Sequence, residues 1–175
     1  MIGKKVILRA LEPEDIEILY RWENDMSIWH LSTTIAPLSK FTLEQYIISA
    51  NQEIYTSHQL RLMIDLVSPQ DGTKTIGSVD LFDFEPTHQR AGVGILILKD
   101  FRGQGLASEA LDLLIDYAFN TLQLHQLFCN ILPENTESIK LFTSKDFVLA
   151  GTKKEWNRIR NSWQDECLFQ LINHS

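Results

Sequence analysis

The chain has 175 residues, of which 44% are hydrophobic, and it carries 16 basic and 23 acidic residues for a net charge of −7. This length predicts one domain, residues 1–175, that can bury a sizeable core. The acidic balance argues against general binding of nucleic acid or of anionic membranes, and the sequence contains no apolar run of membrane-spanning length and no signal peptide.

The hydrophobic periodicity divides the chain into alternating strands and helices. Pro13 fits the first turn of the first helix, and Thr42 with Gln45 forms a capping box for the second. Cys129 and Cys167 lie in apolar strand patterns, which is typical of reduced, buried thiols in a cytoplasmic protein. The predicted order is β-α-α-β-β-β-α-β-α-β-β, with strands at residues 6–11, 60–66, 75–84, 89–98, 127–132, 147–156 and 163–172, and helices at residues 13–25, 42–54, after Gly103 and after Asn135.

The most informative stretch is residues 92–122, where a strand, a glycine-bearing turn and a helix follow one another. The apolar run Ile95–Leu98 predicts a buried strand, and Arg102-Gly103-Gln104-Gly105-Leu106-Ala107 opens a long helical pattern. The unpaired N–H groups of a first helical turn favour a phosphate group, and the glycines let it approach closely. The turn lacks the Lys-Ser or Lys-Thr of a P-loop and the last glycine of the dinucleotide fingerprint. An ordinary strand-to-helix turn is the alternative interpretation.

A second pattern follows about 30 residues downstream. An apolar strand at residues 127–132 leads to Pro133-Glu134-Asn135, in which Asn135 is a good N-cap for the next helix. The pattern continues through residues Ser138, Leu141, Phe142 and Phe147. The alternative is a capped amphipathic helix whose apolar side is simply part of the core.

Together the two patterns resemble the motifs of the GNAT superfamily of acetyl-CoA-dependent N-acetyltransferases. The first matches R-x-x-G-x-A, and the second matches N-x-x-S-x-x-[LF]-[YF]-x-x-x-G-F except that Asp146 replaces the glycine. The element order is also that of the family, so the resemblance spans almost the whole chain. It implies an α/β (α+β) fold with a mixed, mostly antiparallel sheet of six to seven strands, splayed at the centre and flanked by about four helices. The segments at residues 76–93 and 119–135 and the hairpin after Glu155 look most similar to the spermidine and ribosomal-protein-alanine N-acetyltransferases.

The resemblance also implies where acetyl-CoA, the co-substrate, binds. Gly92 and Gly94 fit a bulge that starts the splay, and the pantetheine arm would pair with the exposed edge of the motif strand. At Asp146, a left-handed helix C-cap is expected, which Asp tolerates. No metal ligand set is predicted. The expected coenzyme-binding residues are the strand positions Leu96, Ile97 and Leu98, the turn residues Arg102, Gly103, Gln104, Gly105, Leu106 and Ala107, and Asn135 and Phe142 of the second motif.

Proton handling is where the chain departs from the family. Many relatives use a Tyr at the position of Phe142 as a general acid and a Glu near the position of Gly92. Asp80 is the best substitute base, and its alternative interpretation is a solvent-facing strand residue. His30, which follows Trp29 in the loop expected to border the acceptor site, is a second candidate, although a lone loop His is more often incidental.

The predicted activity is therefore direct transfer of an acetyl group to a primary amine, either of a small amine or polyamine or of a protein N-terminus. Ser32, Thr33 and Thr34 stand where the spermidine enzymes are rich in acidic residues, which weakens a polyamine assignment. The alternative is a catalytically silent acyl-CoA-binding module, because both usual proton-handling groups are missing. Whether the chain forms a homo-oligomer is left open.

Overall fold

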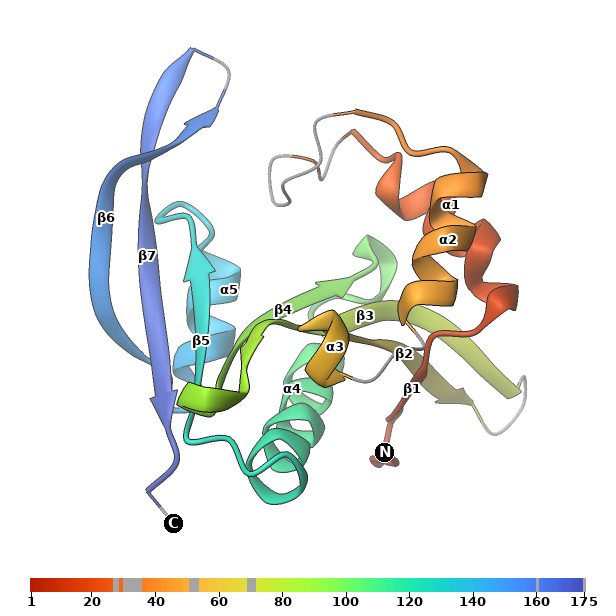
Figure 1. Ribbon diagram of the computed structural model, residues 1–175, viewed down its shortest axis with the longest axis horizontal. Coiled ribbons are helices and arrows are strands. Elements are labelled where there is room, and N and C mark those ends of the chain that lie inside the picture. Colours follow the sequence, from red (N-terminus) through yellow and green to blue (C-terminus); the bar gives the residue numbers. More distant parts are fainter. Residues whose placement is uncertain (27–28, 30–35, 51–53, 69–71, 160, 175) are drawn as a thin grey trace.

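A seven-stranded sheet with helices on both faces forms the body of the molecule (Figure 1). The strand order is β1-β2-β3-β4-β5-β7-β6, and every neighbouring pair is antiparallel except β4 and β5. This confirms the fold expected from the sequence, including the mixed sheet. The computed structural model describes residues 1–26, 29, 36–50, 54–68, 72–159 and 161–174.

The observed elements follow the predicted order with small shifts at their ends, except that a short helix, α3, which was not predicted, lies between α2 and β2. The strands are β1 (Val6–Ala10), β2 (Leu60–Ser68), β3 (Gly72–Glu85), β4 (Arg90–Ile97), β5 (Gln126–Ile131), β6 (Val148–Ile159) and β7 (Ser162–Ile172), and the helices are α1 (Ile16–Glu23), α2 (Lys40–Ala50), α3 (Ile54–Ser57), α4 (Leu106–Asp116) and α5 (Thr136–Thr143).

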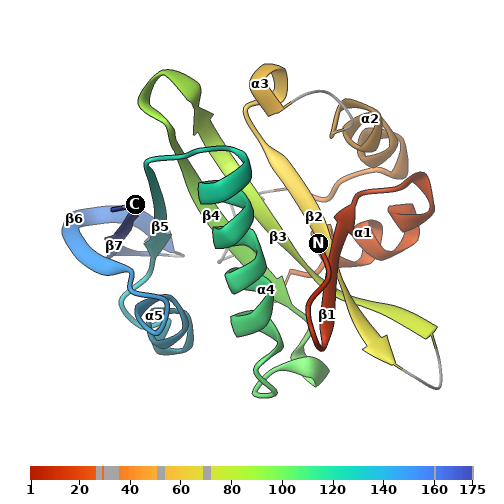
Figure 2. The ribbon, with the colours of Figure 1, turned by 90° about the horizontal axis from the view of Figure 1, so that it is seen from below.

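Strand alternation explains why the sheet has two cores, because successive side chains point to opposite faces. On one face, the β2 residues Leu62 and Ile64 join the larger cluster under α4, and Figure 2 shows α4 and α5 side by side on this face. On the other face, Met63 joins Leu19 of α1 and Leu43 of α2 in a second cluster. The helices α1 and α2 therefore cover the face of the sheet opposite α4.

Two helix starts show how local chemistry sets the boundaries. Pro13 lies in a 3₁₀ turn directly before α1, in agreement with its expected place. The capping box predicted at Thr42 is wrong: α2 begins at Lys40, and the hydroxyl of Ser39 accepts a hydrogen bond from the Thr42 N–H at 3.1 Å. Ser39 occupies the capping position because it lies three residues before Thr42, where a side-chain oxygen reaches the N–H group.

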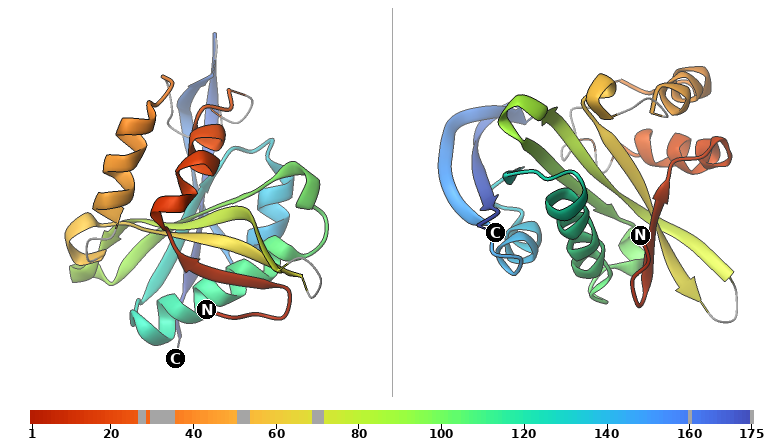
Figure 3. Two further views of the ribbon diagram at one scale, coloured as in Figure 1. Left: turned by 90° about the vertical axis from the view of Figure 1, so that its right-hand side faces the viewer. Right: turned by 60° about the horizontal axis from the view of Figure 1, so that its bottom comes forward.

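The β6–β7 hairpin extends past the rest of the sheet (Figure 3). Its register is irregular between Lys153 and Asn157, and Glu155 has a positive φ of 48° there. In the part of the chain that the structure describes, no helix is long and apolar enough to cross a membrane.

Candidate active site

Strands β4 and β5 separate in the middle of the sheet. They pair only from Arg90 to Gly92, against Gln126 to Phe128, although both strands continue beyond these residues. The edge of β4 after Gly92 therefore faces a gap and not a neighbouring strand. Such an edge can accept an extended ligand as an added strand would be accepted.

The aromatic side chain of Phe82 explains the glycine at position 92. A Cβ atom on Gly92 would overlap the Phe82 ring, which packs edge-on against the Phe128 ring with their centroids 5.7 Å apart. A Glu side chain at this position has no room for the same reason. The bulge expected at Gly92 and Gly94 lies instead on β3, where the register shifts between Phe82 and Glu85 and Asp83 has a φ of 48°.

The open edge of β4 exposes alternate backbone groups. The N–H of Leu98 donates to the carbonyl of Ile76 on β3 at 2.9 Å, and the Leu96 carbonyl lies against Gly77 of β3. Because antiparallel strands direct alternate residues to the same neighbour, the groups of Ile95 and Ile97 face the gap. The predicted backbone role of Leu96 and Leu98 is corrected accordingly, because β3 already occupies their main-chain groups.

The turn before α4 has the geometry of an anion site. Gly103 and Gly105 have φ values of 73° and 77°, and a Cβ on either glycine would meet no atom within 4 Å. Gly105 is the N-cap of α4, and the carbonyl of Gly105 receives the first intrahelical hydrogen bond, from Glu109. The N–H groups of Leu106 and Ala107, in the first turn, therefore have no partner within the helix.

Two further turn residues surround these N–H groups. Arg102 donates from Nε to the Ile97 carbonyl at 2.9 Å, which anchors its guanidinium at the end of β4. Gln104 is exposed, and its side chain reaches the Asp100 carbonyl at 3.3 Å. The turn thus presents main-chain donors and one fixed cation in open space, where the dipole of α4 also favours negative charge.

The second motif has a structural role that the sequence predicted. Asn135 caps α5, with its side-chain oxygen accepting the Ser138 N–H at 3.2 Å. Asp146 has a φ of 64° at the end of the helix, which confirms the expected left-handed cap. Phe142 is 3% exposed and packs edge-on against Phe147 at 5.1 Å. Phe142 is therefore part of the core, and its ring can neither give nor take a proton.

Asp80 belongs to a cluster of charges on the face of the sheet that carries α1 and α2. Its Oδ1 is 2.6 Å from Nε of Arg61, and Nη1 of Arg61 is 2.7 Å from Oε1 of Glu23 on α1. Tyr46 of α2 places its ring 5.3 Å from the Arg61 guanidinium. The Asp80 side chain is 24% exposed, so it faces solvent only in part and is held in an ion pair.

The electrostatics of Asp80 leave it more basic than an ordinary aspartate. Burial raises the pKa of Asp80, while the charge and hydrogen bond of Arg61 oppose the increase only in part. Across the β3–β4 pairing, Asp80 lies opposite Gly94, which has no side chain to cover it. The Asp80 Oδ2 atom accepts no hydrogen bond from the residues that the structure describes. One oxygen of this partly exposed carboxylate therefore remains available for a further hydrogen bond.

The sequence pointed to Asp80 but not to its partners. Arg61 and Asp65 are the two charged residues of the largely apolar run Leu60–Leu66. They alternate with Met63, and this spacing places all three side chains on one face of the strand. The pairing of Arg61 with Asp80 depends on the β2–β3 register, which a sequence does not show.

The other residues considered from the sequence do not add a catalytic group to the described part of the site. His30 and Ser32 to Thr34 lie outside the described residues. Burial raises the pKa of Cys129 to about 12, so this thiol stays protonated and is no nucleophile. Among the described residues, no group of three or more His, Cys, Asp and Glu side chains could hold a metal ion.

Comparison with known families decides what kind of enzyme has this architecture. The model of the acetyltransferase (GNAT) domain matches residues 5–148, which include the diverging strands, the glycine turn and the second motif. The chain belongs to the GNAT acetyltransferase family. It is an N-acetyltransferase, and acetyl-CoA is the acetyl donor that its family uses.

Individual relatives of this N-acetyltransferase cover nearly its whole length. The spermidine N(1)-acetyltransferase of Vibrio cholerae is 27% identical over 169 residues, covering 94% of this chain and 91% of the relative. An uncharacterised N-acetyltransferase, p20 of Bacillus licheniformis, is also 27% identical over 169 residues, covering 97% and 93%. A crystal structure of the spermidine N-acetyltransferase from Vibrio cholerae with CoA and spermine superposes with a TM-score of 0.84 at 24% identity, over 97% of this chain and 96% of that one, and confirms the fold.

The residues present fit acetyl-CoA as the donor. Beyond Gly92 the β4 edge has main-chain groups that no strand pairs, although the Ile97 carbonyl accepts from Arg102, and the α4 turn has open N–H groups with Arg102 at its rim. Gly103 and Gly105 have positive φ values that side-chain-bearing residues rarely adopt, and the absence of a Cβ keeps the backbone of the turn accessible.

Proposed function

We propose that this N-acetyltransferase acetylates a primary amine of a small polycationic acceptor of the polyamine class. The observation that carries the proposal is the Glu23–Arg61–Asp80 cluster, in which two carboxylates share one guanidinium beside the open β4 edge. One negative charge remains in excess, and it attracts an ammonium group. The spermidine acetyltransferase relatives support the same acceptor class.

In this proposal the coenzyme is held mainly by the main chain. Ile95 and Ile97 hold the pantetheine arm, and a backbone N–H at the gap bonds the thioester oxygen as negative charge develops there. Asn135 and Phe142 shape the wall beside the arm. The diphosphate is held by the α4 turn through Arg102, Gly103, Gln104, Gly105, Leu106 and Ala107.

Asp80 is the proposed general base. A lysine-like amine has a pKa of about 10.4 and arrives protonated at neutral pH, so a proton must leave before nitrogen can attack the thioester. Burial raises the pKa of Asp80, which makes its carboxylate a better proton acceptor. Phe142 cannot supply the proton that the thiolate leaving group needs, so that proton comes from water or from the incoming amine.

An acceptor panel tests the proposal. Polyamines, aminoglycosides, amino acids and peptides with free N-termini are assayed with acetyl-CoA for the release of free thiol. We expect turnover with polyamines at acceptor concentrations where the peptides give none. Turnover with peptides alone would contradict the acceptor class. Tight coenzyme binding without turnover on any acceptor would point to the silent acyl-CoA-binding module.

The coenzyme site has its own test, Gly105→Asp with Gly72→Asp as the matched control. Both glycines have a φ near 75° and open space around them, but Gly72 lies at the start of β3 and is not part of the α4 turn. Asp at position 105 puts a like charge against the diphosphate. We expect calorimetry to show a large loss of CoA affinity for Gly105→Asp and a much smaller loss for Gly72→Asp, which lies two residues from Lys74. Unchanged affinity in a folded Gly105→Asp protein would overturn the site.

Two broader expectations accompany this function. We propose that residues 1–175 act as one domain. Strands β6 and β7 follow the end of the matched family model at residue 148, and they complete the same sheet. A cytoplasmic setting suits the two free cysteines, Cys129 and Cys167, which remain thiols in a reducing compartment.

A further inference from the structure

The segment before β1 lies against the coenzyme turn. Figure 2 shows the chain descending from the N-terminus beside α4 and turning into β1 next to the loop that precedes α4. The carboxylate of Glu109, in the first turn of α4, accepts the backbone N–H of Lys5 at 2.8 Å. Gly3 lies so close to this carboxylate that a Cβ there would overlap it. The segment is thus fastened to the helix by its main chain, independently of the lysine side chains.

The Glu109 carboxylate is an unusually well-satisfied anchor. Burial would raise the pKa of Glu109, but the N–H groups of Lys5, Lys4 and Val6 lower it further than burial raises it. The Lys5 N–H donates directly to the carboxylate at 2.8 Å, and the neighbouring N–H groups of Lys4 and Val6 add to the effect on its pKa. Glu109 therefore remains ionised and holds residues 4–6 in a fixed position relative to the α4 turn.

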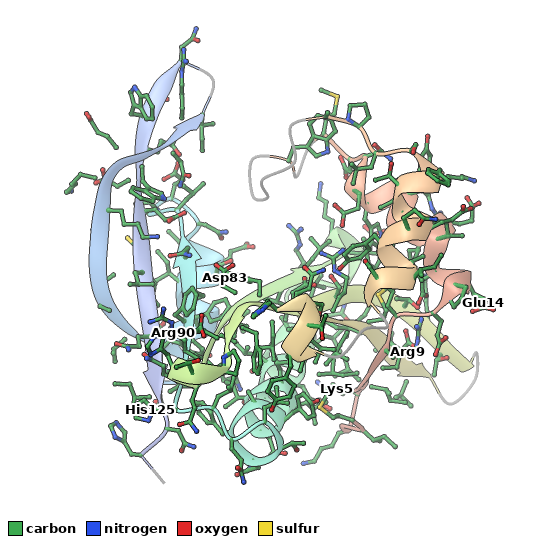
Figure 4. All side chains as sticks on the ribbon, in the orientation of Figure 1. Lys5, Arg9, Glu14, Asp83, Arg90 and His125 are labelled. Atoms are coloured by element: carbon green, nitrogen blue, oxygen red, sulfur yellow. The ribbon has the colours of Figure 1, made fainter. Side chains whose placement is uncertain are left out.

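This anchor brings the Lys5 ammonium to the coenzyme turn. Nζ of Lys5 lies 3.4 Å from the carbonyl oxygen of Gln104, between the two glycines, and the Lys5 side chain is exposed. Figure 4 labels Lys5 at the N-terminal end of β1. An open hollow of about 670 Å³ lies between the segment and the start of α4, and its walls include Lys4, Gly105 and Ser108 together with the carboxylates of Glu109 and Asp112. Lys5 is not part of these walls, so its exposed ammonium lies at the side of the hollow nearest Gln104.

Cations from other segments surround the same turn. Lys74 of β3 lies 4.9 Å from the ring of Phe101, directly before the turn, and Arg102 is anchored to the end of β4. Acidic side chains lie near the turn as well, at Asp100 before it and at Glu109 and Asp112 on α4. In a chain of net charge −7, Lys5, Lys74 and Arg102 offset this negative charge where a polyanionic coenzyme would approach.

We propose that Lys5 is a ligand for a phosphate group of the coenzyme, positioned by Glu109 through the backbone of residues 4–6. The inference rests on the proposed coenzyme site. The contact with Gln104 uses one of the three ammonium donors, which leaves two for phosphate oxygens. A solvated surface lysine with no ligand is the competing account, and it predicts no specific effect of the side chain on coenzyme affinity.

Calorimetry with three ligands tests this without any turnover. CoA carries a diphosphate and a 3′-phosphate, dephospho-CoA lacks the 3′-phosphate, and pantetheine has neither. We expect Lys5→Gln to weaken CoA binding roughly three- to fivefold at low ionic strength, the upper range for an exposed charge pair. Lys5→Arg should restore most of the affinity. Lys154→Gln on the β6–β7 hairpin removes the same charge elsewhere and should leave the affinity unchanged.

The ligand series assigns the phosphate and separates the two proposals. A loss that persists with dephospho-CoA identifies the diphosphate, whereas a loss that disappears identifies the 3′-phosphate, and pantetheine should bind wild type and Lys5→Gln equally. The inference is overturned if Lys5→Gln behaves as Lys154→Gln does, or if pantetheine binding falls as much as CoA binding. If Gly105→Asp abolishes CoA binding in that case, the coenzyme site stands and only the role of Lys5 fails.

Discussion

Two arginines on the same face of the sheet each bridge two acidic side chains, with opposite results. Arg9 bonds Asp15 through both terminal nitrogens at 2.7 and 2.8 Å, and Asp65 through Nε at 2.7 Å. Arg61 makes one contact with Asp80 and one with Glu23. The Arg9 cluster lies under the start of α1 (Figure 4), whereas the Arg61 cluster lies beside the open β4 edge.

The difference between the clusters is the number of hydrogen bonds that each carboxylate receives. Burial raises the pKa of Asp15, but Arg9 and the Glu12 N–H outweigh it and the pKa is lowered. Asp80 receives bonds from Arg61 alone, and its pKa is raised by burial. A closed cluster fixes its charges and fastens the fold, while an open one keeps a carboxylate able to take up a proton.

The largest expected effect is on stability. Arg9→Met leaves Asp15 and Asp65, whose side chains are 8% and 7% exposed, as buried charges without their cation. We expect a loss of about 3–5 kcal/mol in the free energy of unfolding. Arg61→Met should cost less, because Asp80 and Glu23 are 24% and 23% exposed and water can solvate them. Urea unfolding of both variants measures the difference. Equal losses of unfolding free energy would contradict the distinction between a closed and an open cluster.

A smaller effect is expected on turnover when the general acid that Phe142 cannot supply is introduced. Phe142→Tyr introduces a phenol with a pKa of about 10. If its hydroxyl reaches the leaving sulfur, turnover should rise by up to about 10²-fold, the low end for general-acid catalysis. We expect less, because Phe142 is buried against Phe147 and the pocket does not orient a hydroxyl. Steady-state turnover measures the gain. If Phe142 only packs, Phe142→Ala weakens coenzyme binding and Phe142→Tyr changes nothing.

The smallest effect is on the pH dependence of stability, where the two aspartates should have opposite signs. The pKa of Asp15 is lowered on folding, so its stabilisation is present above the unfolded pKa of about 3.9 and is lost as the pH falls through the folded pKa. Asp15→Asn should therefore be destabilising at neutral pH, by an amount that shrinks in acid.

For Asp80 the pKa is raised on folding, so its ionised form costs stability above the folded pKa, and the cost disappears as the pH falls below the unfolded value. Asp80→Asn should thus be neutral or stabilising at pH 7, with a difference that fades in acid. Urea titrations at several pH values compare the two variants. Destabilisation by both to the same extent would show that the clusters do not differ.

Local signals in the sequence were enough to predict how the helices around the coenzyme turn and the second motif begin and end. Gly105 and Asn135 have roles set by helix ends, and Asp146 takes the left-handed conformation expected for it. These features depend on a few neighbouring residues, so a linear pattern records them.

The contacts that depend on strand register could not be predicted in the same way, either at the β4 edge or around Asp80. Whether Ile97 or Leu98 directs its N–H to the gap depends on the register of β3 with β4. Arg61 and Asp80 meet through the β2–β3 register although they are 19 residues apart in sequence. Gly92 became interpretable only with the Phe82 ring in view. Each of these facts requires tertiary contacts that no local pattern contains.

The pH profile of turnover for Asp80→Asn is the most direct test of Asp80 as the general base. With acetyl-CoA saturating and a polyamine as acceptor, the account predicts a lower rate than wild type, with the greatest reduction on the acid side, where removing the proton from the amine is hardest. Asp15→Asn, which changes the closed cluster, serves as the matched control and should keep the wild-type profile while it remains folded. A profile in Asp80→Asn that matches wild type at every pH would remove Asp80 from the mechanism.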